Sequence, residues 1–265
     1  MATSDPIAGR MRHEVAIVTG STSGLGRSIV HRFAEEGAKV VVTGRNEERG
    51  EGVVAACADA PGEVVFIAAD LGDEERCGEL VRATVERFGS LTVLVNNAVA
   101  NAVEPRDTKI ENLATETWEQ VHRIGVTAVM WMCRAAIPEM RAAGHGSIIN
   151  ISSRAAERAT PGLPAYAATK GGMNALTRSI ATDYAAEAIR CNTLAPGYVI
   201  NEGREVLTPE RRRHFERMHL TRLPVAEDIA AAAAFLASRD SEVVTGILLP
   251  VDGGSSTAAR ASSFG

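Results

Sequence analysis

Hydrophobic residues cluster in short blocks along most of the chain, and longer alanine-rich stretches separate these blocks. The short blocks are nearly continuous in valine and isoleucine, as is typical of parallel strands buried on both faces. Their alternation with helical stretches predicts β-α-β units, and therefore a parallel sheet with helices on both faces. The predicted strands are Val15–Thr19, Lys39–Thr43, Glu63–Ala68, Thr92–Asn96, Gly146–Ile151, Arg190–Leu194 and Ile247–Val251.

The longer stretches carry their apolar residues on one side of a helix. Ile29, Val30, Phe33 and Ala34, for example, form one stripe that would face the sheet. The predicted helices are Gly24–Glu36, Asn46–Cys57, Glu74–Arg87, Thr115–Ala142, Ala165–Ala186 and Ala226–Ala237.

No repeat or linker-like segment interrupts this pattern, so one domain is predicted over residues 1–265. The least regular stretch runs from Pro196 to Pro224. Both ends of the chain, residues 1–12 and 255–265, are expected to be flexible.

Composition excludes several classes of function. The net charge of −5 has the wrong sign for a nucleic-acid partner, and acidic residues flank the basic run Arg211–Arg213, which is interpreted as a solvated helix face. No segment reaches the roughly 20 apolar residues of a membrane span, and the first residues do not resemble a signal peptide. A cytoplasmic protein without nucleic-acid or membrane partners is therefore expected.

The cysteines and histidines show no spacing that would indicate a metal site or a disulfide framework. The cysteines lie far apart and are expected to be buried thiols; they are Cys57, Cys77, Cys133 and Cys191. His214 and His219 fall in the irregular stretch, where they could touch a substrate, although surface positions are expected. No metal is predicted.

Glycines are concentrated at the junction between the first strand and the first helix, from Thr19 to Gly26. Glycine lets the backbone turn sharply and approach a pyrophosphate, whose charge the helix N-terminus would meet. The spacing is Gly-x-x-x-Gly-x-Gly, and such a turn could also serve packing alone. The strand before it and the amphipathic helix after it favour phosphate binding. The predicted phosphate-binding residues are Gly20, Ser23, Gly24, Leu25 and Gly26.

The second predicted strand ends in Thr-Gly-Arg-Asn at residues 43–46. An acidic residue there would bind the 2′-hydroxyl of NAD, whereas the guanidinium of Arg45 suits the 2′-phosphate of NADP. NADP(H) is therefore the preferred cofactor and NAD(H) the alternative, since Arg45 could also simply face solvent. Asp70, beside Leu71 at the expected adenine end, could bind the adenine amino group or cap the helix near Asp73.

A serine, a tyrosine and a lysine follow the fifth predicted strand. Ser153 ends that strand region, Tyr166 comes thirteen residues later, and Lys170 follows four residues after Tyr166 on the same helix face. A phenol has an unperturbed pKa of about 10, so proton exchange near neutral pH requires a nearby positive charge, which Lys170 would supply. The Ser153 hydroxyl could hold a substrate carbonyl.

Taken together, these motifs resemble the short-chain dehydrogenase/reductase family. The resemblance runs in order from about residue 13 to residue 254. The matching motifs are Thr19-Gly20 with Gly24 and Gly26, Asn96-Asn97-Ala98, Ser153, Tyr166 with Lys170, and Pro196-Gly197. It implies a single-domain, Rossmann-type, doubly wound α/β fold with a seven-stranded parallel sheet, and a homotetramer or dimer.

The resemblance also implies roles for individual residues. Tyr166 would be the general acid/base, Ser153 the substrate anchor, and Lys170 both a ribose ligand and a modifier of the tyrosine pKa. Residues 198–223 would form a loop that covers the substrate. Further cofactor contacts would come from Asn97, Ala98, Pro196, Gly197 and Val199.

The chain departs from the family pattern at three positions. The family's usual helix asparagine, which helps to hold a proton-relay water, falls on Gly125, so a weakened or rearranged relay is expected. Val99 replaces a common glycine and could narrow the pocket or point into the core. Asn201 stands where a threonine that binds the carboxamide is frequent.

Three functional hypotheses follow. The first is an oxidoreductase that transfers a hydride between NADP(H) or NAD(H) and a carbonyl or secondary alcohol, similar to a 3-oxoacyl-carrier-protein reductase or a ketone or hydroxysteroid enzyme. The second, suggested by Gly125, is a dinucleotide-binding protein with little or no catalysis. The third is elimination chemistry without a nucleotide, which the glycine turn and Lys170 disfavour. The sequence does not identify the substrate.

Overall fold

Seven parallel strands form one sheet in the order β3-β2-β1-β4-β5-β6-β7. The computed structural model describes residues 9–100, 106–158, 160–200 and 208–257. The strands are β1 (Val15–Val18), β2 (Lys39–Gly44), β3 (Glu63–Ala68), β4 (Val93–Asn96), β5 (Gly146–Ile151), β6 (Ile189–Pro196) and β7 (Leu248–Val251). The predicted Rossmann-type, doubly wound sheet is confirmed. Strand order reverses between β1 and β4, where folds of this kind open a ligand crevice at the carboxyl edge of the sheet.

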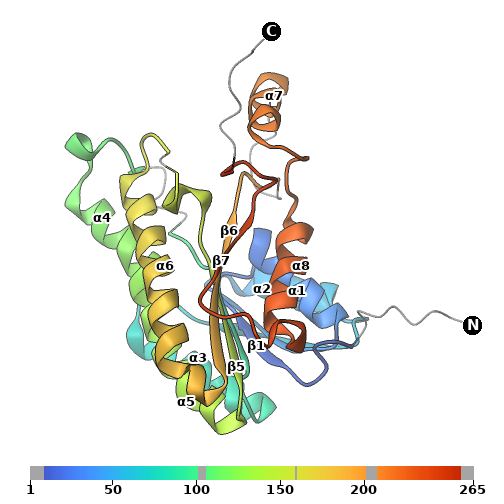
Figure 1. Cartoon of the computed structure of the whole chain (residues 1–265). Helices are drawn as coiled ribbons and strands as arrows, with labels where there is room; N and C mark the ends of the chain where they lie inside the picture. The colour runs from blue at the N-terminus through green and yellow to red at the C-terminus, as the bar shows by residue number, and fades with distance from the viewer. Residues whose placement is uncertain (1–8, 101–105, 159, 201–207, 258–265) are drawn as a thin grey trace, which may run out of the picture.

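Helices cover both faces of the sheet (Figure 1). They are α1 (Gly24–Glu35), α2 (Glu47–Ala56), α3 (Glu74–Phe88), α4 (Thr115–His122), α5 (Ala128–Ala143), α6 (Pro164–Tyr184), α7 (Pro209–Met218) and α8 (Ala226–Ala237). Neighbouring β1 residues serve opposite faces: Val18 packs in a core with α1 and α8, and Ile17 packs in a second core with α3, α5 and α6. Not every strand is fully buried, because β3 and β7 form the edges of the sheet and are half-exposed.

The long helix expected over residues 115–142 is interrupted. Residues Arg123–Thr127 form a π-helical segment between α4 and α5, in which the Ala128 N–H donates to the Arg123 carbonyl. Gly125 lies buried at the centre of this segment. A Cβ at Gly125 would lie 2.2 Å from Cγ2 of Thr169 on α6, so the missing side chain allows the π segment to approach α6 this closely. π segments of this kind are often found at functional sites.

The irregular stretch from Pro196 to Pro224 contains a helix that the hydrophobic pattern did not predict. Thr208 caps α7 by accepting a hydrogen bond from the Arg211 N–H at 3.3 Å, and Pro209 occupies the first helical position. The run Arg211–Arg213 is exposed on this helix, as expected. The surface position expected for His219 is wrong, because its side chain is buried.

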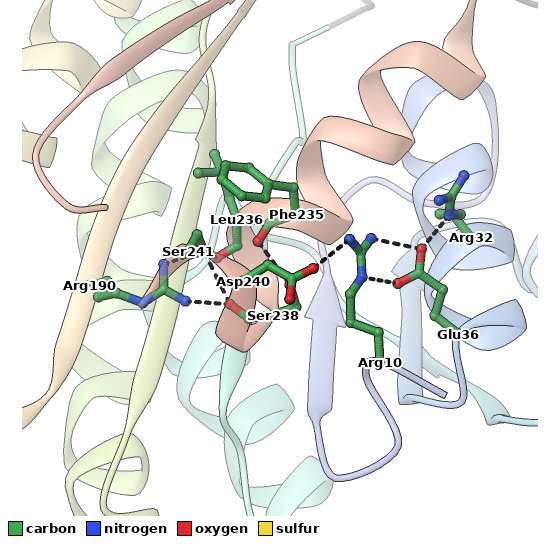
Figure 2. A network of polar contacts seen from close by, with 9 residues as sticks. All are labelled: Arg10, Arg32, Glu36, Arg190, Phe235, Leu236, Ser238, Asp240 and Ser241. Carbon is green, nitrogen blue, oxygen red and sulfur yellow. Dashed lines mark hydrogen bonds and ion pairs between the residues drawn. The ribbon is translucent and has the colours of Figure 1, made fainter. Parts of the chain in front are cut away.

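Residues 9–12 were expected to belong to a flexible tail, but Met11 is buried in the core and Arg10 lies between Glu36 and Asp240 (Figure 2). Arg10 donates two hydrogen bonds to the buried Glu36 carboxylate, at 2.6 and 2.9 Å, and one to Asp240 at 3.0 Å. Arg32 also pairs with Glu36. The network therefore ties the start of the chain to the end of α1 and to the turn after α8. Near the other end, Ser255 is buried, which likewise contradicts a flexible segment beginning at that residue.

The four cysteines are buried and free, as predicted. Burial raises the pKa of Cys77 to about 11 and that of Cys133 to about 12, so both thiols stay protonated at neutral pH. Within the described ranges, none of the helices combines the length and apolarity that a bilayer crossing requires.

Candidate functional site

The glycine turn packs directly against the end of β4. Gly20 and Gly24 adopt positive φ angles of 61° and 55°, which favour glycine. A Cβ at Gly20 would lie 2.8 Å from the Ala98 Cα, and one at Gly26 would lie 2.6 Å from the Asn97 Nδ2. The absence of side chains at these positions lets the turn follow the crevice between β1 and β4.

Thr19 and Asn97 hold the two sides of this crevice together. The Thr19 hydroxyl oxygen accepts hydrogen bonds from the Asn97 and Ala98 N–H groups at 2.9 and 3.1 Å. The Asn97 side-chain amide donates to the carbonyls of Thr19 and Gly20 at 2.8 and 3.1 Å. Asn97 therefore fixes the shape of the turn through its side chain.

The first turn of α1 faces this crevice with backbone donors. The first N–H groups of any α-helix have no partner within the helix. Ser23, the N-cap of α1, makes no side-chain capping bond to them, although serine commonly does so. Leu25 is half-buried against the core below. The glycine turn therefore fits a dinucleotide pyrophosphate, because the N–H groups of the first turn of α1 lack a side-chain cap at the positive end of the helix.

The expected adenosine end lies beside β2 and β3. Arg45 is exposed. A Cβ at Gly44 would lie 2.8 Å from Cγ2 of Thr22, so the glycine turn also closes over the end of β2. Of the two alternatives for Asp70, the capping one is wrong: Asp73 caps α3, whereas Asp70 accepts a hydrogen bond from the Gly72 N–H at 2.9 Å.

Leu71, the other residue expected at the adenine end, is buried in the core beneath α3 and α5. A hollow of about 770 Å³ opens beside the glycine turn, and α1, α2 and α8 line it. Thr22, Ser23, Arg27 and Arg49 contribute to its wall, but none of the candidate catalytic residues does. This hollow therefore does not mark the reaction centre.

The three candidate catalytic residues meet at the carboxyl edge of β5. The Lys170 ammonium is buried, donates to the Ile151 carbonyl at 2.6 Å, and lies 5.7 Å from the centre of the Tyr166 ring. Ser153 follows β5, and its Oγ accepts a hydrogen bond from the Ala155 N–H at 3.1 Å. A serine hydroxyl has one hydrogen to donate and two lone pairs. The Ser153 hydrogen has no acceptor in the part of the chain that the structure describes.

Asp107 is a site residue that the sequence analysis missed. Its buried carboxylate accepts hydrogen bonds from the Ala165 and Tyr166 N–H groups at 3.2 and 2.9 Å. These donors belong to the first turn of α6, where Leu163 provides no side-chain cap. Asp107 therefore supplies the cap from a distant part of the chain and fixes the backbone of Tyr166. No local sequence signal marks a cap that comes from 58 residues away.

The end of β6 approaches the end of β7. A Cβ at Gly197 would lie 2.9 Å from the Asp252 Cβ, so this glycine allows the two strands to end side by side. Val199 is buried in the core with α1 and α8. Tyr198 stacks on Phe215 of α7, with ring centres 3.7 Å apart, which joins the strand end to that helix. Asn201 lies outside the described residues.

Two further residues are His122, at the end of α4, and Val99, just after β4. His122 is half-buried, and its Nδ1 lies 3.0 Å from the Trp118 carbonyl oxygen. Val99 is half-buried at the end of β4. Asparagine could not occupy position 125 unless the Thr169 methyl group moved. The described residues contain no group of three or more His, Cys, Asp or Glu side chains placed to hold a metal ion.

Known proteins of one family are similar to this chain over most of its length. A family model described as enoyl-(acyl carrier protein) reductase matches residues 20–256. The 2,5-dichloro-2,5-cyclohexadiene-1,4-diol dehydrogenase LinX of Sphingobium indicum is 37% identical over 94% of this chain and 98% of its own. The chain belongs to the short-chain dehydrogenase/reductase family.

Other members of the family are also similar to the chain. A 3-oxoacyl-[acyl-carrier-protein] reductase of Chlamydia pneumoniae is 36% identical over 90% of this chain and 95% of its own. A solved structure of a short-chain type dehydrogenase/reductase from Mycobacterium ulcerans superimposes with a TM-score of 0.85, at 26% identity, over 93% of this chain and 91% of that one. The protein is thus an NAD(P)-dependent oxidoreductase that acts on a small molecule.

Proposed function

We propose that the protein interconverts a ketone and a secondary alcohol, with reduction by NADPH as the preferred direction. The observation that carries the proposal is the arrangement at β5, where the buried Lys170 ammonium lies beside the Tyr166 ring and the Ser153 hydroxyl donates its hydrogen to no described residue. A non-catalytic binding protein would not need these three groups together.

Each side chain has a defined task in this proposal. Ser153 donates its hydrogen to the substrate oxygen and holds it. Tyr166 donates a proton to that oxygen during reduction and accepts it during oxidation. The positive charge of Lys170 stabilises the phenolate form of Tyr166. The nicotinamide supplies or accepts the hydride when it is bound.

The glycine turn, Asn97 and Ala98 would hold the dinucleotide, with Pro196, Gly197 and Val199 at its nicotinamide end and Asp70 and Leu71 at its adenine end. The preference for NADP(H) rests on Arg45, which is exposed where the 2′-phosphate would lie. The residue before it is Gly44, so no carboxylate at that position would repel the phosphate. By their names, one relative acts on a cyclohexadienediol and another on a 3-oxoacyl-[acyl-carrier-protein]. Cyclic ketones and 3-oxoacyl compounds are therefore the substrate classes to test.

Fluorescence titration with NADPH and NADH, followed by a screen of ketones, tests the proposal. We expect tighter binding of NADPH, loss of that preference in Arg45→Gln, and no loss in the control Arg82→Gln, which removes an exposed arginine on α3. Turnover should disappear in Tyr166→Phe while cofactor binding remains. Turnover that persists in Tyr166→Phe would overturn the assignment of the general acid. We also expect a homotetramer or dimer, which light scattering would test.

A further inference from the structure

Arg154 lies next to the proposed substrate anchor. It follows Ser153 directly and begins a short 3₁₀ turn, Arg154–Ala156, that packs against α6. The Arg154 side chain is half-buried. Its guanidinium makes no hydrogen bond and no ion pair with any residue that the structure describes. A charged group with five donors, on the residue next to Ser153, therefore has no protein partner among the described residues.

The charged groups around Arg154 do not compensate for it. Arg158 adds a second positive charge, and its guanidinium donates to the Ser255 carbonyl at 3.1 Å. Asp252 is the nearby carboxylate, but it makes no ion pair with Arg154. Its oxygens already accept hydrogen bonds from four donors, which are the Gly254 N–H, the Ser255 hydroxyl, and the Ser256 N–H and hydroxyl.

The electrostatics agree with this geometry. Burial lowers the pKa of Arg154, and the neighbouring Arg158 lowers it further, against a smaller opposing effect of Asp252. A guanidinium nevertheless remains charged at any physiological pH. Holding this charge partly desolvated without a partner is unfavourable, and a bound anion would remove the penalty.

We propose that Arg154 binds a carboxylate of the substrate, which makes the preferred substrate a small keto acid rather than a neutral ketone. This inference rests on the proposed function, because it assigns the anion to the molecule that Ser153 anchors. The planar fork of a guanidinium matches the two oxygens of a carboxylate. Because Arg154 and Ser153 are adjacent, one substrate would carry both the carboxylate and the reacting carbonyl.

Matched acid and ester substrates test this inference. We would measure kcat/KM with NADPH for 3-oxobutanoate, 4-oxopentanoate and 4-acetylbenzoate, and for the methyl ester of each. The wild-type protein should favour the acid in at least one pair. Arg154→Gln should lower kcat/KM for that acid by about 10- to 100-fold and change the ester less than about twofold. Arg154→Lys should restore part of the loss, since it retains the charge but lacks the fork.

The control is Arg82→Gln, which removes an exposed arginine of α3 and should leave both substrates unaffected. Equal losses for acid and ester in Arg154→Gln, or no preference for the acid in any pair, would overturn the inference. If the wild-type protein binds NADPH but reduces none of these compounds, the proposed function fails for this substrate class. Calorimetric titration with benzoate then tests the anion site separately, and the inference fails if the wild-type protein and Arg154→Gln bind benzoate equally or not at all.

Discussion

Gly125 and Thr169 form a contact that a double-mutant cycle can measure. In Gly125→Ala, the new Cβ would lie 2.2 Å from the Thr169 Cγ2, whereas non-bonded carbons normally lie about 3.5–4.0 Å apart. Overpacking of this kind costs about 1–3 kcal/mol, and replacement of a helical glycine by alanine returns about 1 kcal/mol. Gly125→Ala should therefore destabilise the protein by up to about 2 kcal/mol.

The same substitution should act differently in a Thr169→Ser background, which removes Cγ2. The nearest remaining atoms of residue 169, Cβ and Oγ1, lie 3.5 and 3.9 Å from the added Cβ, which are ordinary contact distances. Gly125→Ala should then be neutral or stabilise the protein by about 1 kcal/mol. The coupling free energy between the two sites is expected to be about 1–3 kcal/mol.

Urea unfolding of the four proteins, followed by circular dichroism, measures this coupling. Gly52→Ala is the matched control, because this glycine also lies in a helix and its Cβ would meet nothing within 4 Å. It should stabilise both backgrounds equally. A coupling free energy near zero would refute the steric account of the π segment. The cycle also guides tests of the proton relay. Gly125→Asn should be made in the Thr169→Ser background and compared with the Thr169→Ser single variant.

Two further predictions concern buried carboxylates. Asp107→Ala should destabilise the protein by about 1–2 kcal/mol because α6 loses its cap, and it should lower kcat because the backbone of Tyr166 is no longer fixed. Asp107→Asn should keep part of the stability and part of the activity. Urea unfolding and steady-state kinetics check this, and an unchanged kcat would contradict the positioning role. Burial raises the pKa of Glu14, but hydrogen bonds from His145 and Thr92 outweigh this effect and hold the pKa below 4.5. The same hydrogen bond with Glu14 raises the pKa of His145 above 6.5. The pair therefore stabilises the fold most between about pH 4.5 and 6.5, less as His145 loses its proton above this range, and less as Glu14 gains one below it. The melting temperature of His145→Ala should accordingly differ most from wild type near pH 5.5 and least near pH 9, and a constant difference would contradict the assignment.

The sheet could be predicted from the sequence because its strands are apolar blocks and its turns carry glycine. Each block forms a strand within one residue of its expected bounds, except that β6 runs two residues further, to Pro196. The π segment could not be predicted, since only the position of Thr169 on another helix shows why a side chain is excluded at Gly125. A local signal for α7 was present in Thr208-Pro209-Glu210, but the polar composition of that stretch obscured it.

The candidate site also contains residues that the sequence could predict and residues that it could not. The glycine turn, Ser153, Tyr166 and Lys170 are marked by local motifs, and the structure brings them to one edge of the sheet. The capping role of Asp107 and the lack of a protein partner for Arg154 depend on how distant segments pack together. Such contacts are set by tertiary packing and leave no periodic pattern in the chain.

The contacts of Arg10 bear on the order in which the protein can fold during synthesis. Glu36 follows Arg10 by only 26 residues, so the first strand, α1 and the start of the second strand can join early. Asp240 follows Arg10 by 230 residues and leaves the ribosome shortly before β7. The early half of the network can therefore hold the start of the chain in place while the rest is made, and the late half forms only when the turn after α8 reaches it.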